Sequence, residues 1–341
     1  MNFHHEALLW SKLRSGKIKC LLCERQCIIP MDDTGFCGVR LNLNGTLYSL
    51  SYGKLSAVES RPIEVKPFFH FWPSSTALTF STWGCNFNCP WCQNWHLSMI
   101  HPDWNNIPYI PPKRIVELAV ERGDSGVCVS FNEPLMLFEY SLDVFRIARS
   151  RGLYSTYVSN GYMSIEALKL LRKHGLNGLK VDVKGGEEVY KKYCGGVSAE
   201  HVWKVARSAR EMNIHVEIVY LLVTGVNCDE YSIKSVIERH LKEVGCNTPL
   251  HFTRYFPAYR FHNPPTSINI LEYAYKLAKK LGVNYPYIGN VPGHPYENTY
   301  CPNCGEMLIK RFGSKILKYN LKFDGRCPRC GYEIPIINHL C

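Results

Sequence analysis

Between residues 76 and 290 the sequence alternates short apolar segments with longer amphipathic ones, and this order constrains the fold more than any other feature. The segments predicted to form strands are 76–83, 126–131, 154–159, 178–184, 215–223 and 250–255, with 285–289 as a last strand. The segments predicted to form helices are 111–122, with Gly123 just past its end, 139–151, 164–174, 199–212, 229–243 and 269–281. Six strand–helix units in series predict a parallel sheet with right-handed crossovers.

Polar residues gather directly after these strands, which favours a curled sheet over an open one. Cysteines follow the first strand, FNEP the second and SNG the third, while DVK, TGVN and HFTR mark the ends of the other three. In a barrel the carboxyl ends of all strands line one mouth, whereas an open sheet offers one crevice. We therefore predict an α/β fold with a partial (β/α)6 TIM-like barrel at 76–290. Small cysteine-rich modules are predicted to flank it at 1–75 and 291–341.

Sixteen cysteines are unusual in a chain whose composition is otherwise that of an ordinary globular protein. Eleven of them lie close together in three groups, and such spacing favours metal or cluster ligation over disulfides. The N-terminal group is Cys20, Cys23, Cys27 and Cys37; the loop group is Cys85, Cys89 and Cys92; the C-terminal group is Cys301, Cys304, Cys327 and Cys330. The other cysteines, which we expect to be buried thiols, are Cys128, Cys194, Cys228, Cys246 and Cys341.

The sequence contains no long apolar run and no signal-peptide pattern at its start, so we expect a cytoplasmic protein without a membrane span. The formal charge of +11 points to an acidic partner such as nucleic acid. Metal-bound cysteines are deprotonated, however, and filling all three groups lowers the net charge to roughly +6. The basic composition is therefore weak support for nucleic-acid binding.

The loop group occupies the segment STWGCNFNCPWCQNWH at 81–96, with a C-x3-C-x2-C spacing. Structural zinc sites take four ligands, and iron–sulfur clusters normally take one thiolate per iron. Three thiolates on a 4Fe-4S cluster leave one iron free for chemistry. The alternative is a zinc site with a distant fourth ligand, for which His96 is a candidate.

This spacing, with the aromatic Trp91 directly before the last cysteine, resembles the signature of the radical SAM superfamily. The resemblance implies that the free iron chelates S-adenosylmethionine and that an electron breaks its sulfonium C–S bond. The resulting 5′-deoxyadenosyl radical abstracts hydrogen from a substrate, so the chain is expected to be an iron–sulfur oxidoreductase. The resemblance also implies a ferredoxin- or flavodoxin-like electron donor.

Several further segments resemble one group within that superfamily. CQNWHLS, FNEP, VSNGY, HFTRYFP, YIGNVPG and the segment at 48–73 are similar to those of the AmmeMemoRadiSam-system radical SAM proteins, which are relatives of the pyruvate formate-lyase activating enzymes. The resemblance covers nearly the whole chain. It implies Memo-like and AMMECR-like partner proteins.

The resemblance also implies which residues hold the cofactor. The FNEP segment lies where relatives carry G-G-E-P, so Glu133 and Asn132 are expected to bind the methionine amino group, although Phe131 and Asn132 replace the two glycines. Ser159 and Asn160 stand at a strand end where relatives carry T-N-G. Asn160 is expected to help position the ribose.

Asp182 and Lys184 are expected to face the barrel interior together, because residues two apart on a strand share a face. They resemble the D-L-K segment of relatives, which implies that Lys184 binds the methionine carboxylate while Asp182 binds a hydroxyl or orients the lysine. A structural ion pair is the alternative. His251 resembles a strand-end histidine that contacts adenosine in relatives, with a hydrogen-bonded core histidine as the alternative.

The two remaining cysteine groups predict metal sites outside the barrel. CPNCG at 301–305 and CPRCG at 327–331 form the two knuckles of a zinc ribbon, with rubredoxin-like iron as the alternative. The N-terminal group, with its C-x2-C-x3-C-x9-C spacing, is less distinctive. It predicts either an auxiliary 4Fe-4S cluster or a structural zinc.

Two classes of function compete. The first is a radical SAM enzyme that modifies a protein, an RNA or a metabolite, or that activates a glycyl-radical enzyme. The two extra cysteine modules favour modification, since a minimal activase needs neither. The second is a non-catalytic zinc protein that binds nucleic acid, but this leaves the three-cysteine loop and the polar strand ends unexplained.

Overall fold

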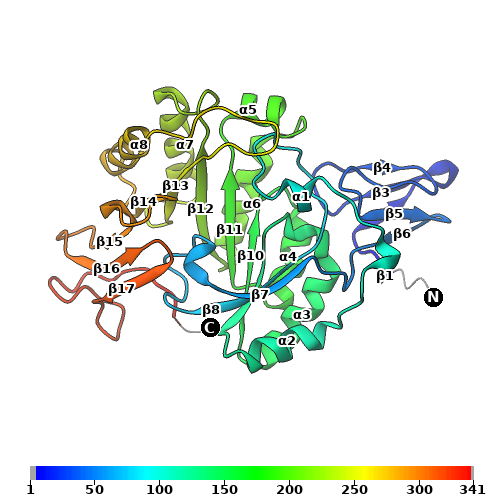
Figure 1. The fold of residues 1–341 in the computed structure, drawn as a ribbon, viewed down its shortest axis with the longest axis horizontal. Helices are drawn as coiled ribbons and strands as arrows, with labels where there is room; N and C mark the ends of the chain where they lie inside the picture. Colours follow the sequence, from blue (N-terminus) through cyan, green and yellow to red (C-terminus); the bar gives the residue numbers. More distant parts are fainter. Residues whose placement is uncertain (1–4, 339–341) are drawn as a thin grey trace.

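The computed structural model describes residues 5–338, and its centre is an eight-stranded sheet (Figure 1). In their order across the sheet the strands are β14 (Pro286–Gly289), β13 (Leu250–Arg254), β12 (His215–Leu222), β11 (Gly178–Val183), β10 (Tyr154–Ser159), β9 (Gly126–Val129), β8 (Thr76–Ser81) and β7 (Ala57–Pro62). Strands β8 to β14 are parallel, and β7 pairs antiparallel with β8. Within the described residues β7 and β14 do not pair with each other, so the predicted partial barrel is confirmed.

Six helices match the predicted helical segments and flank the sheet (Figure 1). They are α2 (Pro112–Glu121), α3 (Phe138–Ser150), α4 (Ile165–His174), α6 (Ala199–Glu211), α7 (Glu230–Glu243) and α8 (Ile268–Leu281). Two short helices were not predicted from the sequence, α1 (Trp95–Ser98) and α5 (Glu187–Tyr193). Short 3-10 turns lie at Arg14–Gly16, Ile63–Val65, Trp104–Asn106, Pro134–Leu137 and Pro295–Glu297.

The strands present different side chains to their two faces, as the pattern of the sequence predicts. On β11, Val181 and Val183 are fully buried in the apolar core, while Lys180 and Asp182 line a cavity inside the barrel. Alternation along a strand separates these two sets, because successive side chains point to opposite faces. Charged residues inside the barrel are therefore placed by strand periodicity and not by a loop.

One end of the barrel is closed by the chain segment that contains Phe69 and His70. The backbone N–H groups of these residues donate to the carboxylate of Glu217, near the start of β12, at 3.0 and 2.8 Å. His215 and His251 contact the same carboxylate through their Nε2 atoms at 2.9 and 2.7 Å. Burial alone would raise the pKa of Glu217, but hydrogen bonds from His215 and His251 bring it well below its ordinary value.

The N-terminal part of the chain forms two small antiparallel sheets beside α3 and α4 (Figure 1). Their strands are β1 (His5–Glu6), β6 (Thr46–Ser49) and β5 (Arg40–Leu43) in one sheet, and β2 (Trp10–Lys12), β3 (Ile18–Cys20) and β4 (Ile28–Ile29) in the other. β7 also comes from the predicted N-terminal module, yet it belongs to the central sheet. The boundary at residue 75 stays a prediction.

The C-terminal part forms a three-stranded antiparallel sheet of β15 (Thr299–Tyr300), β16 (Met307–Phe312) and β17 (Lys315–Tyr319). It packs against the closed end of the barrel, where Phe69 and Tyr287 share an apolar cluster with Leu308. The buried Arg311 donates to the backbone oxygen of Phe69 at 3.0 Å. The segments that carry the C-terminal cysteines are thus fixed to the end of the barrel away from the cavity.

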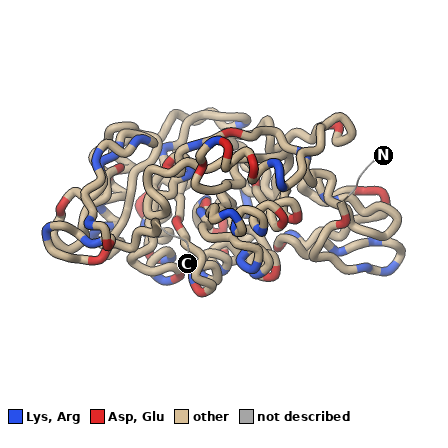
Figure 2. Tube along the Cα trace, turned by 90° about the horizontal axis from the view of Figure 1, so that it is seen from below, with Lys and Arg blue, Asp and Glu red and all other residues tan. Residues whose placement is uncertain are grey.

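Lysine and arginine are interspersed with aspartate and glutamate along the chain (Figure 2). Many of these residues pair locally, such as Arg114 with Glu121 at 2.6 Å on α2. No helix among the described residues is long and apolar enough to cross a membrane.

Candidate functional site

A cavity of about 370 Å³ opens at the carboxyl ends of the central strands. Its volume lies in the range of small-molecule and cofactor sites. The lining includes all three loop cysteines and five of the seven residues predicted to hold the cofactor. These residues are Cys85, Cys89, Cys92, Asn132, Glu133, Asn160, Asp182 and Lys184. Segments that lie far apart in the sequence therefore converge at the mouth of the barrel.

The three-cysteine loop begins soon after β8 and ends where α1 starts. Gly84, with φ of 88°, precedes the first cysteine, and a Cβ at this position would lie 2.5 Å from the backbone oxygen of Cys37. The glycine is therefore required both for the left-handed turn and for the close approach of the N-terminal part. The backbone N–H of Phe87 points to the Sγ of Cys85 at 3.4 Å, as expected for a group that becomes a thiolate.

The thiols of this loop fit a cluster better than a single metal ion. Among the described residues, only the C-terminal group has three or more ligand atoms that all lie within 4.8 Å of one another. A zinc ion with bonds of about 2.3 Å to sulfur needs such close ligands. The alternative fourth ligand, His96, is exposed and is absent from the cavity lining. The donor set of three separated thiols in a cavity fits a 4Fe-4S cluster with one open iron.

The FNEP segment keeps the backbone shape of a glycine-containing turn although it has no glycine. Phe131 has φ of 75°, in the left-handed region that costs a bulky residue free energy. Its carbonyl accepts from the Asn94 side chain at 2.6 Å, and Lys66 lies over its ring at 3.9 Å. Asn132 follows and donates to the Gly84 carbonyl at 2.8 Å, so this turn supports the cysteine loop.

Glu133 is held by the strand end of β10. The Ser159 hydroxyl and the Asn160 backbone N–H donate to its two carboxylate oxygens, both at 2.9 Å. Burial raises the pKa of Glu133 to about 7, and the hydrogen bonds from Asn160 and Ser159 oppose this rise. A carboxyl group with this pKa changes charge near neutral pH. Ser159 itself does not line the cavity and acts here by orienting Glu133.

Asp182 lies between two lysines that face the same cavity. Lys180 Nζ is 2.6 Å and Lys184 Nζ is 3.9 Å from the carboxylate. Burial would raise the pKa of Asp182, but Lys180 and Lys184 lower it below its ordinary value. Lys180 was not predicted as a site residue, although it follows the same period-two pattern as Asp182 and Lys184.

A missed helix also fixes the position of Lys184. The Tyr190 hydroxyl, on α5, accepts a hydrogen bond from the Lys184 backbone N–H at 3.0 Å. Asn227 donates to the Lys184 carbonyl at 2.8 Å. The backbone of Lys184 is thus held from two sides, which leaves its side chain free to point into the cavity.

His251 does not reach the cavity. It is 1% exposed, and its Nε2 contacts Glu217 at the closed end of the barrel. Thr253, two residues further along the same face of β13, takes the place at the cavity wall. This geometry favours the alternative of a hydrogen-bonded core histidine over an adenosine contact.

Of the five cysteines outside the groups, Cys128 and Cys194 are buried as expected, while Cys228 is half-buried. Cys246 is exposed, so the expectation was wrong there, and Cys341 lies outside the described residues. Cys194 has its Sγ 3.8 Å from the Sγ of Cys89. A fourth thiol therefore lies against the loop group, and no sequence motif indicated this.

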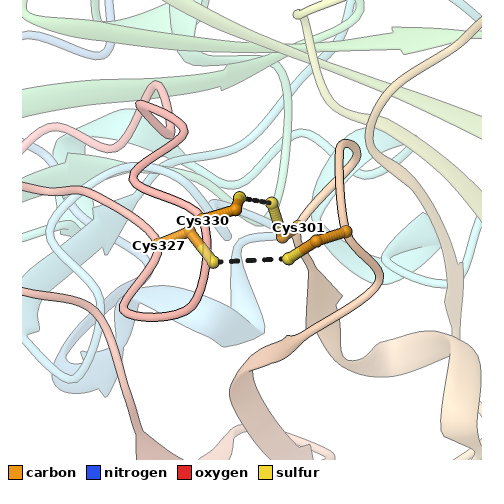
Figure 3. A group of neighbouring side chains, drawn as sticks. Cys301, Cys327 and Cys330 are labelled. Atoms are coloured by element: carbon orange, nitrogen blue, oxygen red, sulfur yellow. Dashed lines mark hydrogen bonds between the residues drawn. The ribbon is translucent and has the colours of Figure 1, made fainter.

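The C-terminal group forms a closed site between two knuckle loops (Figure 3). Cys301 and Cys330 have sulfur atoms 3.6 Å apart, and those of Cys304 and Cys327 are 3.7 Å apart. Four zinc–sulfur bonds of about 2.3 Å in a tetrahedron separate their sulfurs by about 3.8 Å. The spacing and the all-cysteine donor set fit a structural tetrahedral metal ion.

Comparison with known proteins identifies a family and a relative of this chain. The sequence profile described as the radical SAM superfamily matches residues 80–233. The uncharacterized protein MJ0808 of Methanocaldococcus jannaschii is 40% identical over 337 residues, which are 97% of this chain and 99% of that protein.

Two solved structures align with part of this chain. Streptococcus suis SuiB bound to S-adenosylmethionine aligns with a TM-score of 0.50 at 13% identity, over 62% of this chain and 50% of SuiB. A domain of the pyruvate-formate lyase-activating enzyme from Bacteroides vulgatus aligns with a TM-score of 0.42 at 20% identity, over 49% of this chain and 99% of that domain.

Proposed function

The chain belongs to the radical SAM superfamily, and we propose that its loop group binds a 4Fe-4S cluster whose open iron takes S-adenosylmethionine. The observation that supports this most is the meeting of Cys85, Cys89 and Cys92 with the polar strand ends in one cavity. When bound, these groups supply a one-electron cleavage of S-adenosylmethionine to methionine and a 5′-deoxyadenosyl radical, which takes a hydrogen atom from a substrate.

The cavity offers one group of residues for the amino group of the methionine part and another for its carboxylate. Glu133 and Asn132 offer acceptors for the amino group of the methionine part. Lys184 offers a cation for its carboxylate, since Asp182 is shared with Lys180 and leaves Lys184 the looser partner at 3.9 Å. The salt-bridged triad thereby keeps one lysine available inside the barrel.

The substrate that best suits this chain is a protein, an RNA or a metabolite that is modified by hydrogen abstraction. The N-terminal and C-terminal cysteine parts motivate this choice, because a minimal glycyl-radical activase needs neither. Activation of a glycyl-radical enzyme is the second candidate. Memo-like and AMMECR-like proteins and a ferredoxin- or flavodoxin-like electron donor belong to the same proposal.

A non-catalytic zinc protein that binds nucleic acid is a weaker candidate. It accounts for the C-terminal group and the formal charge of +11. It gives no role to a polar cavity with three thiols, and acidic residues are interspersed with the basic ones (Figure 2).

The direct test is anaerobic reconstitution with iron and sulfide, followed by dithionite and S-adenosylmethionine, with 5′-deoxyadenosine measured by chromatography. We expect wild type and Cys246→Ala to form it and Cys89→Ala to form none, because Cys246 is exposed and belongs to no cysteine group. Equal product from Cys89→Ala and wild type would contradict the proposal. So would a loop that retains zinc and takes up no iron.

A further inference from the structure

The four cysteines of the N-terminal group line a cavity of their own. Cys20 ends β3, Cys23 and Cys27 lie in the turn before β4, and Cys37 precedes β5. The rest of the wall consists of five apolar or small residues and three polar ones. They are Leu22, Ile29, Gly35, Leu135 and Met136, and Arg25, Arg40 and Asn86. None of the described residues lines both this cavity and the one at the mouth of the barrel, so the two are distinct.

Two buried side chains on this wall carry nitrogen atoms that find no hydrogen-bond partner among the described residues. Arg40 is 1% exposed; its Nη1 donates to Glu139 at 2.7 Å, while its Nε and Nη2 have no partner within residues 5–338. Asn86 is also 1% exposed, and its Nδ2 has no partner in the described part of the chain. A buried donor without an acceptor costs free energy, so such atoms need an explanation. An occupant of the cavity with negative charge and several acceptors supplies one.

The spacing of the thiols separates a cluster from a single ion. The C-terminal group, with all four sulfur atoms within 4.8 Å of one another, has the spacing of a zinc site. Among the described residues neither the N-terminal group nor the loop group meets that limit. Two of the three groups thus hold their thiols further apart, as ligands at the separate corners of a cube must be. A cluster also brings sulfides, which accept hydrogen bonds from buried N–H groups.

Arg25 ties this cavity to the three-cysteine loop. It lies between Cys23 and Cys27 in the sequence and donates to the Asn86 carbonyl, one residue after Cys85. Its Nη2 also donates to the carbonyl of Gly195 at 3.0 Å. The N-terminal group is therefore fixed beside the loop and is not a loosely attached module.

We propose that the N-terminal group binds a second 4Fe-4S cluster, to whose sulfur atoms Arg40 and Asn86 donate hydrogen bonds. Each of its four irons receives one thiolate, so this cluster has no open position for S-adenosylmethionine. Its charge of about −2 is partly balanced by Arg40. The proposal goes beyond the proposed function, because it holds or fails irrespective of what the loop group binds.

The test uses the full chain, reconstituted anaerobically, with iron, sulfide and zinc measured per chain. Wild type and Cys246→Ala should bind about eight irons, and both a Cys23→Ser/Cys27→Ser variant and a Cys85→Ala/Cys89→Ala/Cys92→Ala variant should lose about four each. After chemical reduction, the Cys85→Ala/Cys89→Ala/Cys92→Ala variant should still show an electron paramagnetic resonance signal. Addition of S-adenosylmethionine should leave that signal unchanged. The same ligand should alter the signal of the Cys23→Ser/Cys27→Ser variant.

Native mass spectrometry of wild type gives a second measurement that does not depend on whether a variant folds. A mass increment of two clusters and one zinc supports the proposal. Two zinc ions and one cluster would overturn it, as would a Cys23→Ser/Cys27→Ser variant that keeps all its iron. If the loop variant keeps the same iron content as wild type but the Cys23→Ser/Cys27→Ser variant loses about four irons, the proposed function fails and this inference stands.

Discussion

Arg40 and Glu139 form a buried ion pair, with Nη1 and Oε1 2.7 Å apart and side chains that are 1% and 2% exposed. Arg40 starts β5 and Glu139 lies at the start of α3, so the pair joins the N-terminal part to the barrel. Glu139 also accepts from the backbone N–H of Leu8 at 2.8 Å. One carboxylate thus fixes both the position of the N-terminal sheets and the orientation of the arginine at their cysteine cavity.

In the protein before iron is added, Glu139→Gln should destabilise the fold by about 3–5 kcal/mol, because it leaves the buried charge of Arg40 without its counterion. Denaturant unfolding under anaerobic conditions measures the change. Glu121→Gln is the matched control: its pair with Arg114 is equally short at 2.6 Å, but both side chains are about half exposed. We expect that control to cost less than about 1 kcal/mol. Similar losses in the two variants would show that burial does not decide the strength of the Arg40–Glu139 pair.

Binding of S-adenosylmethionine should strengthen as pH rises through about 7, where Glu133 ionises. Burial raises the pKa of this carboxyl above its ordinary value. As pH rises from that ordinary value to about 7, the unfolded chain loses this proton before the folded protein does, so the free energy of unfolding falls. A bound ammonium group offsets that cost. Calorimetric titration from pH 6 to 8 should show the rise in wild type and a flatter profile in Glu133→Gln. If wild type and Glu133→Gln show parallel profiles, Glu133 does not bind the ligand. Ionisation of the ligand's own amino group is common to both titrations and does not affect this comparison.

Lys184→Met should weaken S-adenosylmethionine binding by roughly 10- to 100-fold, the loss expected for a buried charge-assisted hydrogen bond. Burial lowers the pKa of Lys184, but Asp182 raises it above its ordinary value, so the lysine is charged at neutral pH. Lys191→Met, an exposed lysine on α5, is the control and should bind normally. Equal dissociation constants for the two variants would assign Lys184 a structural role only.

Phe131→Gly should be more stable than Phe131→Ala by about 1 kcal/mol, since the φ of 75° disfavours every residue with a Cβ. Both variants lose the ring and its contact with Lys66, so their difference reports the backbone alone. At Tyr231, an exposed position on α7, the order should be the reverse, with alanine more stable than glycine. Alanine proving the better residue at both positions would show that the turn relaxes when Phe131 is removed.

Cys304→Ser should release about one zinc ion per chain and leave the iron content unchanged. The strands β15–β17 pack on Phe69 and Tyr287 but are held together at their tips by the knuckles, so we expect faster proteolysis around 301–330. Metal analysis and limited proteolysis, each beside Cys246→Ala, measure both effects. Loss of iron instead of zinc would assign the C-terminal group to rubredoxin-like iron.

Strand and helix order, the loop spacing and the two C-terminal knuckles could all be predicted from the sequence. Each depends on residues that are neighbours in the chain or that repeat at a fixed period, as for Asp182 and Lys184 on β11. The same rule includes Lys180. It was left out of the prediction because the family motif covers only Asp182 and Lys184, although the strand periodicity already placed Lys180 on the same face.

Tertiary structure alone decided several other features of the site. His251 contacts Glu217 and leaves the cavity wall to Thr253, because its depth along β13 is set by pairing with β12. Cys194 meets Cys89 across more than a hundred residues of sequence, a contact that no local pattern encodes. Phe131 keeps a glycine-like φ through contacts with Asn94 and Lys66.

The three cysteine groups show most clearly which features follow from the local sequence and which depend on tertiary packing. Their spacing in the sequence predicts that each group is a ligand set. Whether four thiols close around one ion or stand apart for a cluster depends on how distant segments pack around them. Knuckle loops bring the C-terminal sulfurs together, whereas Arg40 and Asn86 are brought to the N-terminal cavity from β5 and from the loop after β8. Local sequence fixes ligand identity, and packing between remote segments fixes the distances that select the metal.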